Sequence, residues 1–140
     1  MMRHARAMAH RSTAEILADL RARLETARLD LLALFRALDQ MDLLPAEIPQ
    51  RLMRQLFELD ADYAEALWAL DQPPASLDLR AMLRDTLAAL DELPDACARF
   101  RTRLPHRAHA ILAQLEITVR HGLDPAEAYS MVPGRSPQNG

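Results

Sequence analysis

The chain has 140 residues, of which 50% are hydrophobic and 26% are charged, and its formal net charge is −3. This is the size of one compact domain, and the longest apolar runs (31–35 and 66–70) are far shorter than the about 20 residues that span a bilayer. With three glycines and one cysteine, the sequence excludes a phosphate-binding glycine loop, a disulfide framework and a cysteine zinc site. Because no secretory hydrophobic region follows the arginine-bearing start, we expect a cytoplasmic protein with no membrane contact.

The residue types favour helices throughout. Alanine and leucine contribute 25 residues each, whereas valine, isoleucine and threonine together contribute 11. Helices favour the first two types and sheets favour β-branched residues, so the composition predicts an all-α protein. All 17 basic residues are arginine, which GC-rich coding explains most simply; selection for bidentate guanidinium contacts is the alternative.

The first predicted helix follows a basic arm at residues 1–11. Ser12 and Glu15 form a capping-box pattern at its start. Apolar residues then recur with spacings of three and four, which predicts one helix of about 26 residues, roughly 39 Å long. They are Leu17, Leu20, Leu24, Ala27, Leu31, Leu34 and Leu38.

The second predicted helix begins near Pro45 or Pro49 and ends at about Leu70, before the Pro73–Pro74 pair. Its apolar positions are Leu52, Leu56, Leu59, Tyr63, Ala66 and Leu70. The aromatic residues Phe57, Tyr63 and Trp68 are interpreted as core residues.

The third predicted helix takes Ser76 as its N-cap and Asp78 in its first turn. The same apolar phase continues past Pro94 to Leu104, yet proline disrupts helices, so we expect a break or a sharp kink near Pro94. The fourth helix carries Ala108, Ile111, Leu112, Leu115 and Val119, and Gly122 is expected just after its end in the left-handed conformation. A short helix is expected from Asp124, followed by a tail.

These elements predict an all-α, antiparallel bundle of four main helices, one of them kinked or broken near Pro94, plus a short C-terminal helix. The expected organisation is a basic N-terminal arm at 1–11, a single bundle domain at 12–131 and a flexible tail at 132–140.

Two charged groups are candidate contact sites. Residues 58–95 carry a net charge of −8, and Glu58, Asp62 and Glu65 share one face of the second helix, with Asp60 nearby. A solvated acidic face is the simplest interpretation; cation binding and docking of a basic partner are the alternatives. The second group, Arg99, Arg101, Arg103 and Arg107, lies in a stretch without acids and could contact phosphates. Pairing with the acids of 58–95, within or between subunits, is the favoured interpretation.

No catalytic grouping is present. The sequence has no Glu-x-x-His pair for a diiron site and no Cys-x-x-Cys-His haem motif, so we expect no metal and no cofactor. His106 and His109 are interpreted as surface residues, and Cys97 as a small residue on the inward face.

We therefore expect a non-enzymatic helical protein that acts through protein–protein contacts, as a homodimer or homo-oligomer, an adaptor or an accessory subunit. One alternative is a nucleic-acid-associated subunit that uses Arg99–Arg107, whose affinity would fall steeply with salt. Another is a bundle that binds a small apolar ligand or cofactor between its helices.

Overall fold

The computed structural model describes residues 11–73 and 78–123. Its elements are α2 (Thr13–Asp39), the short 3₁₀ helix η1 (Pro45–Glu47), α3 (Gln50–Leu70), α4 (Leu79–Thr102) and α5 (His106–Gly122). The described part contains no strand, so the all-helical prediction is confirmed. Residues 1–10 of the expected 1–11 arm, the Ser76 cap, the short helix from Asp124 and the tail at 132–140 lie outside these residues.

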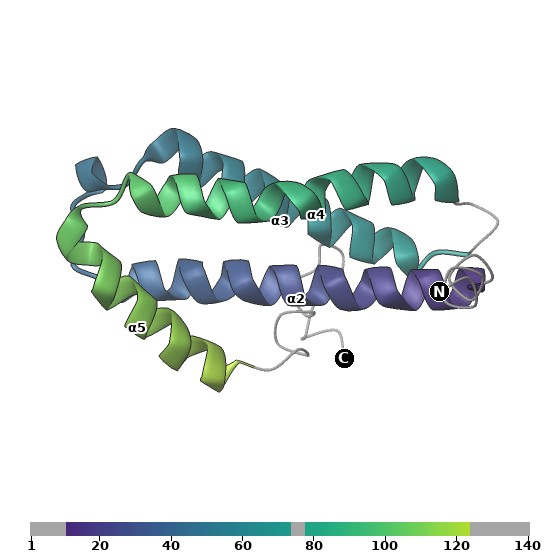
Figure 1. The fold of residues 1–140 in the computed structure, drawn as a ribbon, viewed down its shortest axis with the longest axis horizontal. Coiled ribbons are helices and arrows are strands. Elements are labelled where there is room, and N and C mark those ends of the chain that lie inside the picture. Colours follow the sequence, from purple (N-terminus) through teal and green to yellow (C-terminus); the bar gives the residue numbers. More distant parts are fainter. Residues whose placement is uncertain (1–10, 74–77, 124–140) are drawn as a thin grey trace, which may run out of the picture.

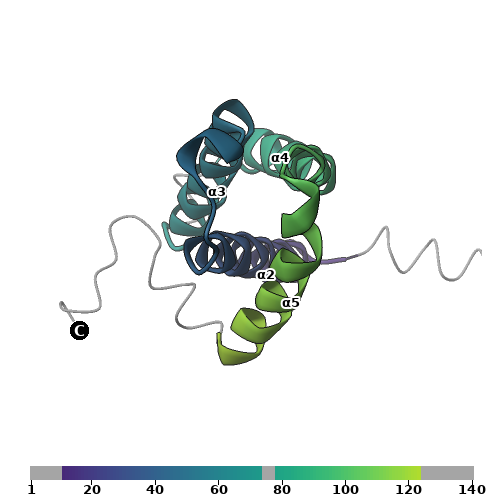
Figure 2. The same ribbon diagram turned by 90° about the vertical axis from the view of Figure 1, so that its left-hand side faces the viewer.

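Three long helices lie lengthwise beside one another. Figure 1 shows α2, α3 and α4 aligned along the long axis, whereas α5 leaves the end of α4 at an angle. Seen end-on in Figure 2, α5 crosses α2 instead of continuing along the other helices. Accordingly, α3 packs against both α2 and α4, and α5 packs chiefly against α2.

The predicted heptad of α2 lies in the core. Six of its seven positions are buried and Leu17 is half-buried. The helix begins where expected, because the Ser12 hydroxyl accepts a hydrogen bond from the Glu15 amide at 3.1 Å. Ser12 also donates to the Glu15 carboxylate. The core is completed from the other helices by Leu56, Leu59, Tyr63, Ala66, Leu67, Leu90, Leu93, Ala96, Phe100, Leu104, Ala108 and Leu112.

Of the break or sharp kink expected near Pro94, the break is absent, because α4 runs from Leu79 to Thr102 with Pro94 inside it. Pro94 is exposed, whereas Leu90, Leu93 and Ala96 are buried on the other side of the helix. Packing on both sides of the proline therefore maintains the helix despite the missing amide hydrogen.

The ends of two helices also differ from expectation. Asp78, expected in the first turn of α4, is its N-cap, and its carboxylate accepts from the Ala81 amide. Gly122 is the last residue of α5, without a left-handed backbone, so the expectation that it follows the helix was wrong.

Three apolar side chains predicted to lie inward are exposed. Phe57 and Trp68 on α3 are 51% and 46% exposed, and Ile111 on α5 is also exposed; among the aromatic residues of α3 only Tyr63 is fully buried. Phe57 lies against Phe35 of α2, with ring centroids 4.8 Å apart. Phe57 therefore covers the edge of the α2–α3 contact, and neither Phe57 nor Trp68 fills the core.

Candidate functional site

The carboxylates of Glu58, Asp62 and Glu65 remain exposed on α3. Within the described part of the chain, no arginine or histidine side chain forms an ion pair with any of the three. We call these three residues the acidic face.

Asp60, which the sequence places among them, points elsewhere. Its carboxylate receives two hydrogen bonds from the Arg28 guanidinium of α2, at 2.9 and 3.2 Å. The Arg28 side chain is only 6% exposed. Asp60 therefore belongs to the α2–α3 contact, on the opposite flank of α3 from the acidic face.

The charges of the acidic face act on one another. Partial burial raises the pKa of Asp62, and repulsion from Glu65, Glu58 and Glu92 raises this pKa further. Glu92 belongs to α4, where it accepts a hydrogen bond from Gln55, a neutral donor. The negative potential of α3 therefore extends onto α4.

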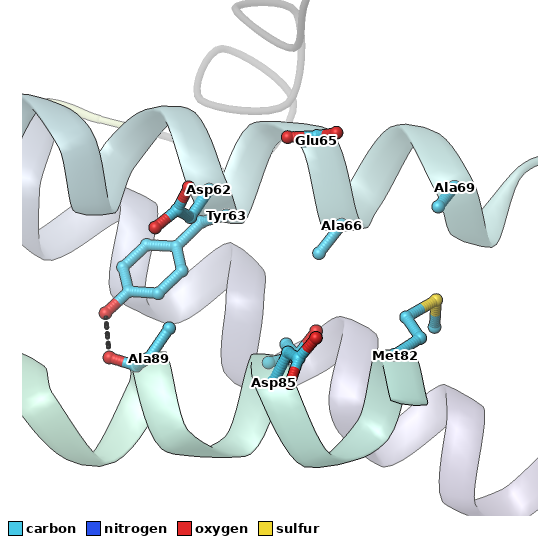
Figure 3. Close-up of a pocket in the computed structure, with 9 residues that line it drawn as sticks. Asp62, Tyr63, Glu65, Ala66, Ala69, Met82, Asp85 and Ala89 are labelled. Atoms are coloured by element: carbon cyan, nitrogen blue, oxygen red, sulfur yellow. Dashed lines mark hydrogen bonds between the residues drawn. The ribbon is translucent and has the colours of Figure 1, made fainter. Parts of the chain in front are cut away.

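A groove of about 390 Å³ lies between α3 and α4 beside the acidic face. Figure 3 shows Ala66 and Ala69 of α3 opposite Met82 and Asp85 of α4, with Asp62 and Glu65 on the α3 side. Tyr63, Thr86 and Ala89 complete the lining. Asp85 has a cation beside it, since the guanidinium of its neighbour Arg84 lies 3.5 Å away, with both side chains largely exposed. The groove thus combines an apolar lining with three carboxylates.

Tyr63 closes one end of this groove. Its hydroxyl donates a hydrogen bond to the backbone carbonyl of Ala89 at 2.8 Å, across the gap between the helices (Figure 3). Burial, with smaller effects of nearby anionic groups, raises the pKa of Tyr63. The phenol therefore stays neutral and links α3 to α4.

The four arginines of the predicted basic patch have different surroundings: two pair with carboxylates of the same chain, and two are exposed. Arg101 pairs with Glu116, and Arg107 pairs with both carboxylate oxygens of Glu47. Neither carboxylate lies in 58–95, so internal pairing of these two arginines with the acidic segment was a wrong expectation. Arg99 and Arg103 are exposed.

The remaining candidates occupy other places. His106 and His109 are exposed at the start of α5, with ring centroids 5.4 Å apart. Cys97 lines a cleft of about 440 Å³ between α2, α4 and α5, and burial raises the pKa of its thiol. The same cleft is lined by the ion pairs Arg101–Glu116 and Arg120–Asp30. Among the described residues, no group of three or more His, Cys, Asp and Glu side chains is placed to hold a metal ion.

The α4 side of the groove was not identified from the sequence. Asp85 and Thr86 belong to a helix 20 or more residues further along the chain than the acidic face. One feature of the sequence could have indicated this side of the groove. The apolar phase of α4 places Thr86 at an inward position where leucine would be typical. A hydroxyl at such a position needs a partner or a solvent-filled groove.

Comparisons of the chain with models of known protein families, with curated proteins and with solved structures gave no match. Over the described residues, no helix has an apolar stretch long enough to cross a bilayer. The chemistry of the acidic face and the groove is therefore the basis for a functional conclusion.

Proposed function

We propose that the chain is a non-enzymatic, cytoplasmic helical protein that works by protein–protein contact and that the acidic face of α3 docks a positively charged partner surface. One observation carries this proposal. The chain has 17 arginines and uses many of them in internal ion pairs, yet Glu58, Asp62 and Glu65 form none with the described residues. Such an array of like charges raises the free energy of the isolated chain, and a cationic surface would lower it.

The proposal includes the form of the assembly. The partner is a second copy of this chain, for which Arg99 and Arg103 offer exposed positive charge, or a larger complex of which the chain is an adaptor or accessory subunit. Nucleic acid is a weaker candidate, because Arg101 and Arg107 already bind carboxylates of their own chain.

We also propose that the four main helices form one bundle in which successive helices run antiparallel, with α5 inclined to the other three. The contacts Arg21–Asp71, Arg28–Asp60 and Phe35–Phe57 support the antiparallel sense of the first pair, because residue numbers fall along α3 as they rise along α2. The hydrogen bonds Gln55–Glu92 and Tyr63–Ala89 support the same sense for α3 and α4, and a connection of only three residues links α4 to α5.

The test of docking is charge reversal. The full chain with Glu58→Arg, Asp62→Arg and Glu65→Arg is compared with the unaltered chain by light scattering coupled to size exclusion, and by crosslinking in cells. We expect the assembly to weaken by at least about tenfold in dissociation constant, because like charges placed opposite each other at an interface cost several kcal/mol. Circular dichroism should show unchanged helicity.

The matched control carries the same charge change elsewhere. Asp39, Asp42 and Asp95 are exposed and lie outside the acidic face and the groove, so their reversal to arginine should leave the assembly intact. If the two triple variants assemble equally well, or if only the control loses its partner, the proposed docking face is wrong.

A further inference from the structure

The groove beside the acidic face offers two kinds of surface to one ligand. Ala66, Ala69 and Met82 supply apolar lining, and the carboxylates of Asp62, Glu65 and Asp85 lie around it. A side chain that fits both has an apolar stem and a cationic end, as arginine and lysine do. A wholly apolar ligand would leave the carboxylates without a partner, and an inorganic cation would not use the apolar lining.

A polar group inside the groove points to the same kind of ligand independently of the acidic residues. Thr86 is 7% exposed and lines the groove. No hydrogen bond joins its hydroxyl to another of the described residues, in contrast to Thr102 and Thr118, which donate to the carbonyl four residues earlier. The Thr86 oxygen is not among the fully buried atoms without a partner, so it is accessible from the groove and can accept a hydrogen bond from a bound group or donate one to it.

We propose that the groove between α3 and α4 binds an arginine side chain of the docked protein, with the guanidinium among Asp62, Asp85 and Thr86 and the stem against Ala66, Ala69 and Met82. This inference rests on the proposed docking function and identifies the group that the partner inserts. Arginine suits the site better than lysine, because its planar guanidinium carries five donors, which can reach several acceptors at once. The groove volume of about 390 Å³ is within the range of specific ligand sites.

The arginine nearest in sequence to Asp85, Arg84, does not occupy the groove. Arg84, which lies beside Asp85, is largely exposed and is not part of the groove lining. An incoming guanidinium therefore competes only with a solvated pair of neighbouring residues, and pairs of that kind contribute little free energy.

The experiment is a titration of the isotope-labelled full chain followed by amide NMR shifts. The probe is N-acetyl-arginine amide, and its matched control is N-acetyl-citrulline amide, which has nearly the same shape without the charge. We expect saturable shifts at Ala66, Ala69, Thr86 and Ala89, with citrulline binding about tenfold more weakly because it lacks charged hydrogen bonds. Equal binding of the two probes, or arginine shifts confined to residues outside the groove, would overturn the proposal.

Two variants locate the site within the groove. Ala69→Leu should fill the lining and weaken arginine binding about tenfold, whereas Ala61→Leu, at an exposed position of α3 outside the groove, should leave it unchanged. Thr86→Val keeps the side-chain shape and removes the hydroxyl, so it should weaken binding about threefold to tenfold even if Ala69→Leu perturbs packing. If arginine binds both groove variants as tightly as the unaltered chain, the groove is not the site.

The two proposals can fail separately. If charge reversal disrupts the assembly but arginine gives no groove shifts, the acidic face docks the partner without an inserted arginine. If arginine binds the groove but reversal of Glu58, Asp62 and Glu65 leaves the assembly unchanged, the groove is a ligand site and the docking function is wrong.

Discussion

Asp60 and Asp62 are two residues apart on α3, yet they have opposite electrostatic surroundings. Asp60 faces α2 and receives two hydrogen bonds from the buried Arg28. Asp62 lines the groove beside α4, and its pKa is raised first by partial burial and then by repulsion from Glu65 and Glu58 of α3 and Glu92 of α4. A helix turns about 100° per residue, so two acids that are two residues apart point to nearly opposite sides of the helix and meet different neighbours. The flank of α3 with Asp60 has its negative charge paired with an arginine of the same chain. The flank with the acidic face has negative charges without such a pair among the described residues, and a partner could neutralise them.

The largest expected change in stability comes from loss of the Arg28–Asp60 pair on the flank of α3 that faces α2. Asp60→Ala removes the acceptor of Arg28 and leaves a guanidinium whose side chain is 6% exposed without that partner. We expect the free energy of unfolding to fall by about 3–5 kcal/mol, which urea denaturation monitored by circular dichroism measures. A loss below about 1 kcal/mol would mean that the pair contributes no more than a surface ion pair.

A double replacement sharpens this first prediction. Arg28→Met combined with Asp60→Leu removes both charges and keeps an apolar contact between α2 and α3. We expect this chain to recover most of the stability lost by Asp60→Ala, because the cost arises from a buried charge without its partner. Failure to recover would mean that packing around Asp60 matters more than its charge.

The next effect concerns the hydrogen bond that links the two helices of the groove. Tyr63→Phe removes the hydroxyl that donates to the Ala89 carbonyl. We expect a loss of about 1 kcal/mol, because that carbonyl can still accept the hydrogen bond of its own helix. Urea denaturation measures it, and the m-value should not change, since the same surface becomes exposed on unfolding.

The smallest expected change in stability is an increase, and it comes from Asp62 in the acidic face. The pKa of Asp62 is raised above its ordinary value of 3.8, so the folded chain binds this proton more tightly than the unfolded chain. Ionisation of Asp62 therefore lowers stability as the pH rises from that value through the folded-state pKa. Asp62→Asn should make the protein slightly more stable at pH 7, and the difference should vanish at a pH below the ordinary value.

Thermal unfolding of Asp62→Asn and the unaltered chain over a range of pH checks this prediction. Asp95→Asn is the control, because Asp95 is exposed and is not a source of the shift at Asp62. A destabilised Asp62→Asn at neutral pH would mean that the carboxylate has a favourable partner in the folded chain, which would also weaken the case for docking.

The sequence predicted the helices and most of the core, because helical periodicity is a local property. The heptad of α2 identified residues that are buried, and the positions of Pro49 and Pro105 at the starts of α3 and α5 agree with proline's preference for helix ends. The expectation of a break at Pro94 was wrong because the effect of this proline on α4 depends on packing against other helices, which periodicity does not include.

The site was predicted in part for a similar reason. Helical spacing grouped Glu58, Asp62 and Glu65 correctly on exposed positions of α3, and it placed Asp60 nearby without revealing Arg28 as its partner. The groove requires α4 to lie beside α3 in one register, and spacing within a single helix contains no information about that register. Phe57 and Trp68 were assigned to the core as aromatic residues of the second helix, although both are exposed.

The tilt of α5 has a consequence for the motions of the molecule. Only Ala108 and Leu112 of this helix are buried, and its packing is chiefly against α2. Segments with few buried contacts open at a lower free energy than the core from which they detach. Amide hydrogens of α5 should therefore exchange with solvent by local opening, well before those of α2 and α3, so that this helix can detach while the packing of α3 and α4 around the groove persists.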